Sequence, residues 1–213
     1  AIRAARGEIA GAEDVSAAWI TSALVSLGMV LGGQQAVAAD NPATAVFAGG
    51  CFWCTESDFE KVPGVLAAES GYTGGRKANP TYEQVSDGGT GHTEAVRVTY
   101  DPARVNYAQL VEYFWRTIDP TVRNRQFCDV GSQYRSAIFW QTDEERAIAE
   151  KSRDALLASG RFKEVHTEIE KASVFYPAEE YHQDYYKKNP IRYGYYRHGC
   201  GRDDRLKELW GQK

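Results

Sequence analysis

The stretch Gly49-Gly50-Cys51-Phe52-Trp53-Cys54-Thr55-Glu56 decides how the rest of the chain is organised. The apolar run Thr44-Ala45-Val46-Phe47 leads into it, and an amphipathic stretch continues to Val62, where Pro63-Gly64 follows. This order predicts a strand, a tight turn and a helix, with Cys51 at or near the first helical residue. The two glycines permit the sharp turn, and we expect them to leave open space above the Cys51 sulfur.

The position of Cys51 predicts a nucleophile. The unpaired N–H groups and the positive dipole end of a helix N-terminus favour a thiolate over a thiol. The alternative is a buried, inert cysteine, which is common for this residue type. A core cysteine has no need of a preceding Gly49-Gly50 or of the two large aromatic residues that follow. The reactive interpretation is therefore favoured.

The composition is that of a soluble globular protein. The chain has 213 residues, enough for one sizeable domain with its own core, and 43% of them are hydrophobic and 25% charged. The net charge of -4 gives no basic excess that would attract a nucleic acid. The four cysteines are too few and too irregularly spaced for a disulfide scaffold, and they do not form the two pairs that structural zinc usually needs, so we expect no metal.

Residues 1–39 differ in pattern from the remainder. Arg3 and Arg6 precede an apolar run over residues 17–31, and small residues follow at 36–39. A positive start, a short apolar centre and a small-residue exit are typical of a secretory signal peptide. We therefore expect 1–39 to be a signal peptide and the protein to be periplasmic or otherwise exported. An uncleaved N-terminal extension on a cytoplasmic protein is the alternative, and the catalytic domain spans 40–213 in either case.

Hydrophobic periodicity predicts alternating strands and helices beyond the first motif. We expect strands at 65–68, 93–100, 134–140 and 165–169, and helices at 107–117 and 143–159, the second opened by a capping box at 142–145. Loops are predicted at 71–75, 88–92, 123–133 and 193–201, a helical turn at 79–82, a short helix at 180–186 and a basic amphipathic helix at 202–210. The predicted fold is a two-layer α/β (α+β) sandwich of the ferredoxin-like plait type, with a mixed sheet and a long, loop-rich C-terminal tail.

Glu94 is the candidate proton donor. In a strand over 93–100 it shares a face with Val96 and Val98, where burial disfavours the charged carboxylate and raises its pKa. The alternative is a structural ion pair with Arg97 or Arg135. Arg97 points to the opposite face of the predicted strand, which weakens that pairing.

Several other side chains could complete a site around Cys51. Tyr82 and Tyr134 offer hydroxyl groups and Asp129 a second acid, each in or next to a loop. Phe52 and Trp53 could form the wall of an apolar pocket, or could be the first core residues of the helix. His182 is interpreted as a histidine that is hydrogen-bonded within the tail, without a catalytic role.

Five segments in register resemble the A-type peptide methionine sulfoxide reductases, over roughly residues 44–190. They are Gly50-Cys51-Phe52-Trp53 with Glu56, Gly71-Tyr72-Thr73-Gly74-Gly75, Asn79-Pro80-Thr81-Tyr82, Gly91-His92-Thr93-Glu94, and Gly131-Ser132-Gln133-Tyr134-Arg135-Ser136. The resemblance implies an enzyme that reduces the S epimer of methionine sulfoxide, protein-bound or free, to methionine. Such an enzyme restores an oxidised thioether.

The resemblance also implies a role for each site residue. Cys51 attacks the sulfoxide sulfur, Glu94 gives a proton to the sulfoxide oxygen, and Tyr82 and Tyr134 hydrogen-bond that oxygen. Phe52 and Trp53 hold the substrate methyl group, and Asp129 matches a polar position of the same pocket. A raised-pKa acid with two hydroxyl donors suits a step that builds charge on oxygen.

The same resemblance implies how the enzyme is recycled. Cys51 becomes a sulfenic acid, a second cysteine condenses with it, and thioredoxin or a similar dithiol reduces the disulfide, so we expect no bound cofactor and a monomer. The resolving cysteine is predicted to be Cys200, which Gly199 and Gly201 flank in a mobile loop. Cys54 is the alternative. Many family members have glycine at this position, so the cysteine is a departure of this chain, and it creates a Cys51-x-x-Cys54 pair with a redox-competent spacing.

Two further functions would fit part of these features. A thioredoxin-like dithiol-disulfide oxidoreductase would use Cys51 and Cys54 and would not need Glu94 or the tyrosines. A peptide-binding domain with an aromatic groove would not need a reactive thiol. Cys128 is interpreted as a bystander near the pocket.

Overall fold

The computed structural model describes residues 41–211, so the predicted signal peptide at 1–39 lies outside the described part. The strands are β1 Ala43–Gly49, β2 Val65–Thr73, β3 Thr93–Tyr100, β4 Arg125–Gln126, β5 Asp129–Val130, β6 Ser136–Trp140, β7 Glu168–Lys171 and β8 Tyr176–Pro177. The helices are α1 Phe52–Phe59, α2 Tyr82–Ser86, α3 Tyr107–Trp115, α4 Asp143–Ala158, α5 Tyr185–Lys188, α6 Pro190–Gly199 and α7 Arg202–Trp210, with a 3₁₀ turn at Ser132–Tyr134. Among these residues, none of the helices combines the length and apolar character that spanning a membrane requires.

Within residues 41–211, six strands form one mixed sheet in the order β7-β6-β1-β3-β2-β8. The central four, β6-β1-β3-β2, are antiparallel neighbours and come from a β-α-β-β-α-β arrangement, the ferredoxin-like plait. β7 extends this core in parallel beside β6, and β8 pairs with the other edge. The predicted fold class and the mixed sheet are confirmed.

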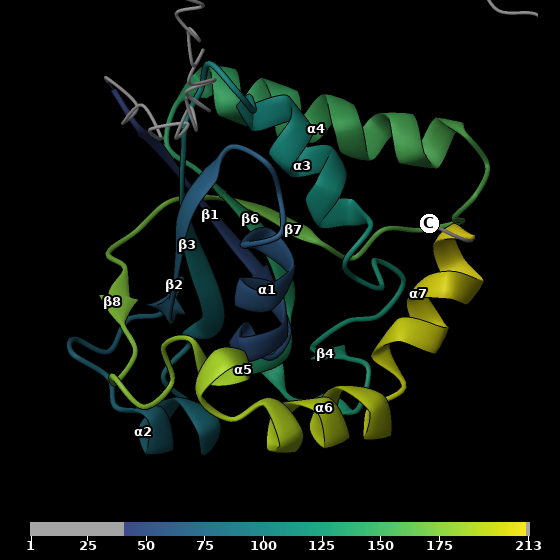
Figure 1. The fold of residues 1–213 in the computed structure, drawn as a ribbon. Helices are drawn as coiled ribbons and strands as arrows, with labels where there is room; N and C mark the ends of the chain where they lie inside the picture. Colours follow the sequence, from purple (N-terminus) through teal and green to yellow (C-terminus); the bar gives the residue numbers. More distant parts are fainter. Residues whose placement is uncertain (1–40, 212–213) are drawn as a thin grey trace, which may run out of the picture. The chain divides into compact units, whose positions relative to one another are not determined.

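The helices cover one face of the sheet with a larger apolar core. α1 lies across β1, β2 and β3, while α4 packs against α3 and β6 (Figure 1). Phe47 of β1 stacks on Phe59 of α1 and Phe114 of α3, with ring centroids 4.8 and 5.1 Å apart. Each fully buried phenylalanine contributes about 1.5–3 kcal/mol of transfer free energy. The other face carries a smaller cluster that includes Val46 and Phe139.

The turn before α1 needs glycine at position 50 because its backbone is left-handed there and Gln126 packs closely against it. Gly50 has φ +83°, and a Cβ on it would lie 2.5 Å from Cβ of Gln126. Gln126 is fully buried, and its amide group holds the backbone N–H and C=O of Asp119. The expectation that the glycines leave space above the sulfur is therefore wrong at Gly50. The close approach fixes the turn against the β4–β5 hairpin, with Cys51 as the N-cap residue of α1.

Local predictions were wrong mainly at the ends of strands and in the tail. β2 continues to Thr73 because Gly71 and Tyr72 pair with β8, where a loop was predicted. At α4 the Thr142 side chain accepts from the Glu145 backbone, but the Glu145 carboxylate binds the Gln141 backbone, so the predicted reciprocal capping box is only half formed.

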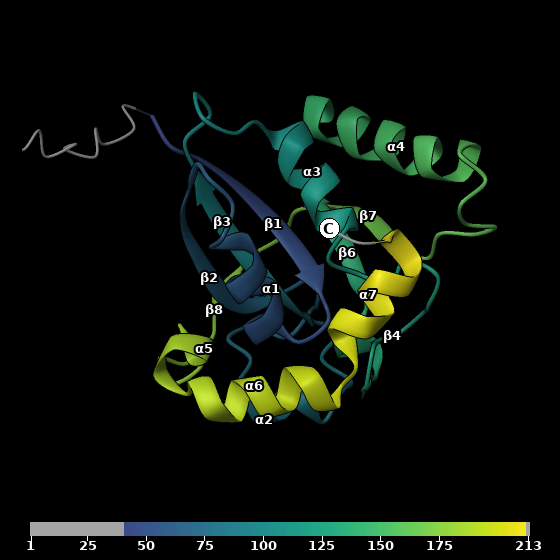
Figure 2. The ribbon, with the colours of Figure 1, turned by 45° about the vertical axis from the view of Figure 1, so that its right-hand side comes forward.

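The largest difference is α6, which replaces the predicted loop at 193–201. Pro190 lies at the first position of this helix, where its fixed φ and missing N–H are tolerated, so Asn189-Pro190 begins a helix rather than ending structure. The predicted short helix at 180–186 is displaced and spans Tyr185–Lys188 as α5. The C-terminal tail is therefore a series of three helices that follow the lower and right-hand sides of the domain (Figure 2).

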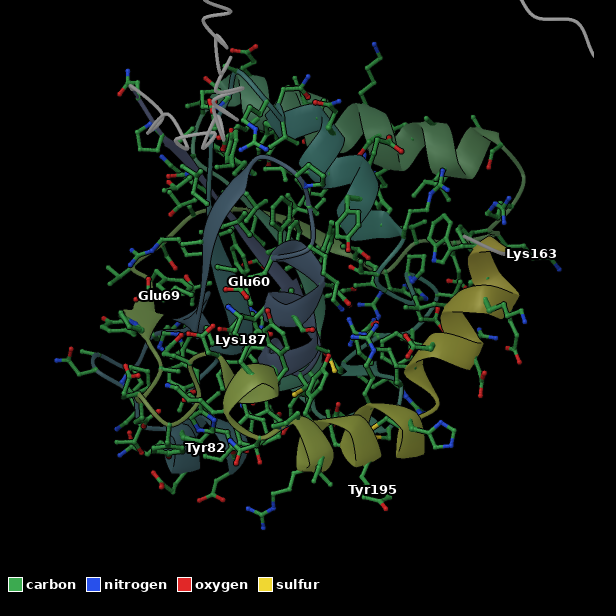
Figure 3. All side chains as sticks on the ribbon, in the orientation of Figure 1. Glu60, Glu69, Tyr82, Lys163, Lys187 and Tyr195 are labelled. Carbon is green, nitrogen blue, oxygen red and sulfur yellow. A yellow bond between two sulfur atoms is a disulfide. The ribbon has the colours of Figure 1, made fainter. Side chains whose placement is uncertain are left out.

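The tail is held on α1 by buried and half-buried carboxylates. Glu56 accepts hydrogen bonds from the Ser70 hydroxyl at 2.6 Å and from the Asp184 backbone at 2.7 Å. The Lys187 ammonium group of α5 forms an ion pair with the Glu60 carboxylate at 2.5 Å, and both residues are labelled in Figure 3. Burial raises the pKa of Glu56 to about 7, so this carboxyl is partly protonated at neutral pH. Glu56 therefore holds the tail by hydrogen bonds, whereas Glu60 holds it by an ion pair with Lys187.

Candidate active site

The chain brings the sequence-predicted pocket residues together in one small cavity of about 60 Å³. Its lining residues are Cys51, Phe52, Trp53, Tyr82, Glu94, Asp129, Tyr134 and Tyr196. They come from the start of α1, the start of α2, β3, the β4–β5 hairpin, the following 3₁₀ turn, and α6. Segments that are far apart in sequence therefore meet at the N-terminus of α1.

Cys51 and Cys54 are both buried free thiols whose sulfurs share a hydrogen bond. Burial, the bond to Cys54 and the negative charge of Glu94 raise the pKa of the Cys51 thiol. The hydrogen bond from Cys51 lowers the pKa of Cys54 to about 7 against the effect of burial, with help from the charges of Arg202 and Arg197. The two sulfurs thus form one proton-sharing pair, in which Cys54 is the more acidic thiol.

The expectation that the helix N-terminus favours a Cys51 thiolate is wrong, because the pKa of Cys51 is raised. Cys51 is only 6% exposed, and the first backbone N–H groups of α1 are directed to other partners. Phe52 N donates to Glu94 Oε2 at 2.9 Å, and the amides of Cys54 and Thr55 donate to the Cys51 carbonyl. The helix end therefore places an acid beside Cys51 instead of stabilising its charge.

Glu94 lies on β3 beside Cys51 and is 2% exposed. Burial raises the pKa of its carboxyl to about 8, against the hydrogen bond from Phe52, and the negative charge of Asp129 contributes. The predicted direction of this shift is confirmed. Neither arginine considered as a structural partner pairs with it, since Arg97 binds Glu69 and Arg135 binds Glu168 at 2.8 Å. At neutral pH the pocket holds a protonated carboxyl.

Tyr196 is the pocket residue that the sequence did not single out. Its hydroxyl donates to Asp129 Oδ2 at 2.5 Å and also contacts the Cys51 sulfur. Burial raises the pKa of Tyr82, Tyr134 and Tyr196, so all three remain neutral hydroxyl donors. The chain has 13 tyrosines, and no spacing in the tail distinguishes Tyr196 from its neighbours.

An aromatic cage forms the apolar side of the cavity. Phe52 lies stacked near Tyr82, and Trp53 stacks on Tyr185 with ring centroids 3.7 Å apart. The indole N–H of Trp53 donates to Nδ1 of His182 at 3.0 Å. His182 therefore bonds to α1, not within the tail as expected, and it fixes the orientation of the Trp53 ring.

The two remaining cysteines form a disulfide. Cys128, next to Asp129 in the β4–β5 hairpin, is bonded to Cys200 at the end of α6, with Cα atoms 4.9 Å apart. Cys200 thus lies in an ordered corner between two helices rather than in the mobile loop that was expected. Its role as the resolving cysteine stays a prediction, and Cys128 acquires a partner that the sequence did not indicate.

Two groups of possible metal ligands occur among the described residues, each with its ligand atoms within 4.8 Å of one another. One comprises Cys128, Asp129 and Cys200, and the disulfide already uses both of its sulfurs. The other comprises the acids that bind the tail, Glu56, Glu60 and Asp184, and Lys187 supplies their positive charge. Both groups are therefore explained by contacts within the protein.

The pocket combines a buried thiol pair, a protonated carboxyl, neutral hydroxyl donors and an aromatic wall. This set can transfer a proton to an uncharged polar group while a sulfur attacks next to it. A plain dithiol exchanger needs only the two sulfurs, so the protonated Glu94 favours attack on a substrate that carries an oxygen to be protonated.

Comparison with known proteins identifies the family to which the chain belongs. A family model described as peptide methionine sulfoxide reductase matches residues 43–213. The MsrA 2 protein of Caulobacter vibrioides is 54% identical over 176 residues, which cover 83% of this chain and 89% of that protein. MsrA of Bacillus licheniformis is 53% identical over 170 residues, which cover 79% and 94%.

Solved structures agree with these sequence matches. Methionine sulfoxide reductase A of Corynebacterium diphtheriae is 36% identical, with a TM-score of 0.63 over 76% of this chain and 81% of that one. Mxr1 of Saccharomyces cerevisiae in its reduced form is 33% identical, with a TM-score of 0.66 over 70% and 87%. On these matches, the chain belongs to the peptide methionine sulfoxide reductase family, A type.

Proposed function

We propose that the protein reduces methionine S-sulfoxide, in oxidised proteins and as the free amino acid, to methionine. The observation that carries this is the protonated Glu94 carboxyl beside the Cys51 thiol in a small aromatic cavity. The cavity is large enough for the methyl sulfoxide end of a side chain. Phe52 and Trp53 would contact the methyl group, and the hydroxyls of Tyr82 and Tyr134 would bind the oxygen.

The first chemical step uses the proton-sharing pair. Cys51 gives its proton to the Cys54 thiolate and attacks the sulfoxide sulfur, while Glu94 protonates the sulfoxide oxygen. The oxygen leaves the substrate sulfur and becomes bonded to Cys51, so Cys51 is oxidised to a sulfenic acid and methionine is released. Tyr196 contacts the Cys51 sulfur during this step, and its hydrogen bond to Asp129 holds the Tyr196 hydroxyl in place.

We propose that Cys54, rather than Cys200, resolves the sulfenic acid. The Cys54 sulfur already accepts a hydrogen bond from the Cys51 thiol, whereas the Cys200 sulfur is bonded to Cys128 and would first have to be reduced and moved. The Cys54 sulfur attacks Cys51, the S–O bond breaks and water leaves with the Cys54 proton. Thioredoxin or a similar dithiol protein then reduces the Cys51–Cys54 disulfide.

A single-turnover experiment tests the proposed function. The enzyme is mixed with one equivalent of each epimer of a methionine sulfoxide peptide in separate reactions, without reductant. We expect one methionine per enzyme from the S epimer, and a Cys51–Cys54 disulfide on peptide mapping by mass spectrometry. If neither epimer is reduced, the proposed function is wrong.

Replacing Cys54 by serine is expected to stop turnover with a thioredoxin system after about one methionine per enzyme, because the sulfenic acid then lacks its neighbour. The matched control is a double variant, Cys128→Ser with Cys200→Ser, which is expected to keep turning over within about threefold of the wild-type rate. The measurement is methionine released against time. If the double variant stops after one methionine and Cys54→Ser keeps turning over, Cys200 is the resolving cysteine.

We also propose that the protein acts in the periplasm. The pattern of residues 1–39 supports export, and the Cys128–Cys200 disulfide is of a kind that persists in oxidising compartments. The reductant would then be an extracytoplasmic thioredoxin-like protein. Cell fractionation with N-terminal sequencing should find the protein in the periplasm, cleaved after Ala38 or Ala39, and uncleaved cytoplasmic protein would contradict export.

A further inference from the structure

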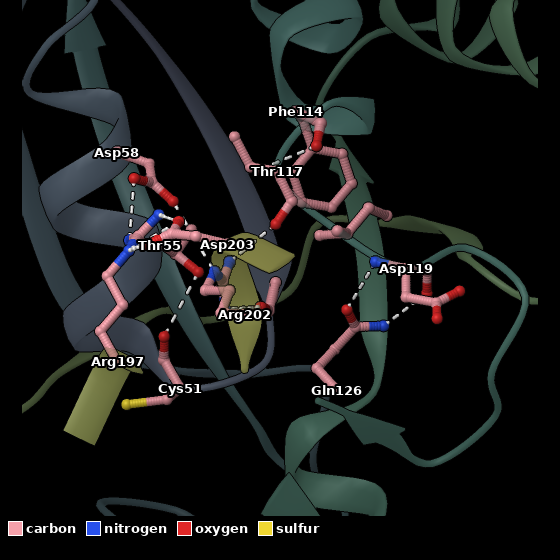
Figure 4. A network of polar contacts seen from close by, with 12 residues as sticks. Cys51, Thr55, Asp58, Phe114, Thr117, Asp119, Gln126, Arg197, Arg202 and Asp203 are labelled. Carbon is pink, nitrogen blue, oxygen red and sulfur yellow. Dashed lines mark hydrogen bonds and ion pairs between the residues drawn. The ribbon is translucent and has the colours of Figure 1, made fainter. Parts of the chain in front are cut away.

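A buried charge cluster, which we define as Asp58, Arg197 and Arg202, is labelled in Figure 4, and none of its residues lines the substrate cavity. Asp58 follows Cys54 by one turn of α1, so the two side chains share a face of the helix. Arg197 comes from α6 and Arg202 from α7. The mechanism proposed above uses none of these three residues.

The buried part of the cluster holds two arginines and one carboxylate. Asp58 and Arg202 are each 2% exposed, and Arg197 has a side chain that is 12% exposed. Arg197 lies 3.0 Å from Oδ1 of Asp58, whereas Arg202 lies 3.8 Å from Oδ2, beyond hydrogen-bond distance. Arg197 also makes an ion pair with Asp203 at 2.7 Å, at the exposed edge of the cluster, so its charge is shared between two carboxylates.

Arg202 is additionally fixed to the backbone of the catalytic turn and to the backbone that follows α3. Its guanidinium donates to the carbonyl of Gly49 at 3.2 Å and to that of Thr117 at 2.8 Å, and it lies 4.5 Å from the centre of the Phe127 ring. Its Nε and the Oδ2 of Asp58 are buried without a hydrogen-bond partner. A buried polar atom without a partner is costly, so an arginine held in this way calls for an explanation.

The thiol of the catalytic pair that faces this cluster is Cys54. The charged and titratable groups that face Cys54 are Cys51, Asp58, Glu94, Tyr193, Arg197 and Arg202. Tyr193 is neutral and Glu94 is protonated at neutral pH, so neither supplies a full negative charge. A Cys54 thiolate is therefore the anion that the positive charge of Arg202 would stabilise.

We propose that Arg202 is a positioning residue for the resolving step, holding Cys54 as the attacking thiolate and fixing the Gly49 turn so that Cys54 faces the Cys51 sulfenic acid. This rests on the proposed function. In the step, Cys54 gives up the proton that it received from Cys51, its sulfur forms the S–S bond, the S–O bond of Cys51 breaks, and the leaving hydroxide takes that proton and departs as water. A buried positive charge favours the attacking thiolate, and Arg202 is not among the residues that line the cavity.

The proposal is tested by removing the positive charge of Arg202 and the negative charge of Asp58 separately and measuring the pKa of Cys54. The background is Cys51→Ser, in which Cys128 and Cys200 are bonded to each other and Cys54 is the remaining thiol of the chain. Ultraviolet absorbance of the thiolate against pH then reports on Cys54 alone. Arg202→Gln is expected to raise the pKa of Cys54 and to make the thiolate about tenfold rarer at neutral pH. Asp58→Asn is expected to lower the same pKa.

Opposite shifts from Arg202→Gln and Asp58→Asn would not follow from a purely structural role. Circular dichroism and thermal unfolding check that each variant is folded, and Arg202→Lys, which keeps the charge, should lie closer to the parent. If the two variants shift the Cys54 titration in the same direction, or not at all, the proposal is overturned.

Kinetics with Cys51 intact separates this proposal from the proposed function. With Arg202→Gln, one methionine should still form per enzyme, although more slowly because Cys54 also accepts the Cys51 proton. The Cys51 sulfenic acid should persist at least about tenfold longer before the disulfide forms, as trapped by dimedone. Disulfide formation at the wild-type rate would refute the role of Arg202. Absence of methionine from the wild-type enzyme would instead refute the proposed function.

Discussion

Replacing Cys51 by serine is expected to abolish reduction of methionine sulfoxide, with no methionine formed even in a single turnover. The sulfur of residue 51 supplies the electrons and accepts the oxygen atom, and a serine hydroxyl can do neither. The loss therefore exceeds that expected from a weakened nucleophile. The measurement is methionine released from an S-sulfoxide peptide, with and without a thioredoxin system.

Cys54→Ser is the matched control for this result. It removes a thiol of the same pair from the same helix, yet it should still release about one methionine per enzyme, because Cys51 remains to attack. Thermal unfolding of both variants checks that the α1 region is folded. If Cys51→Ser forms methionine at a rate comparable with Cys54→Ser, then Cys51 is not the attacking residue.

The sequence predicted the architecture well where periodicity is local and strong. Apolar residues alternate along β3 and recur at helical spacing along α3, so both elements were predicted from their periodicity. The stretch from Gly49 to Glu56 predicted the strand, turn and helix that carry Cys51. Glu94 could be predicted because one carboxylate among Val96 and Val98 on a strand face is unusual. The convergence of the other pocket residues followed from the family resemblance.

The remaining features depend on contacts between distant segments. α6 forms where a loop was predicted, since its two glycines weaken the local helical signal while docking on α1 supplies the stability. Cys200 pairs with Cys128 across 72 residues, a pairing that spacing cannot reveal. The raised pKa of Cys51 depends on burial and on Glu94, both of which outweigh the local helix end.

Replacing Glu94 by glutamine is expected to slow methionine formation by about 10²- to 10⁴-fold at neutral pH, the usual contribution of a positioned proton donor. The amide has the shape of the carboxyl and its oxygen can still accept from the Phe52 backbone, so the turn should be preserved. It cannot give a proton to the sulfoxide oxygen. Stopped-flow single-turnover kinetics gives the rate, and a rate within about threefold of wild type would exclude Glu94 as the donor.

The pH dependence distinguishes a lost proton donor from a damaged site. The pKa of Glu94 is about 8 in the folded protein, above the value of about 4.3 for an unfolded glutamate, so the folded state binds more protons between these two values. Wild-type stability should therefore fall as pH rises through this range, and the rate of methionine formation should fall above about pH 8. Glu94→Gln should lose the decline in rate and should lessen the decline in stability, to which other buried carboxyls such as Glu56 also contribute, as measured by single-turnover rates and urea unfolding.

Glu56→Gln is the matched control for that pH behaviour. Glu56 is also buried, and burial raises its pKa to about 7, but its hydrogen bonds go to Ser70 and the Asp184 backbone instead of the cavity. Its removal should change the pH dependence of stability in the same direction, while the decline in rate above about pH 8 remains. If Glu56→Gln abolishes that decline and Glu94→Gln keeps it, the proton comes from a group other than Glu94.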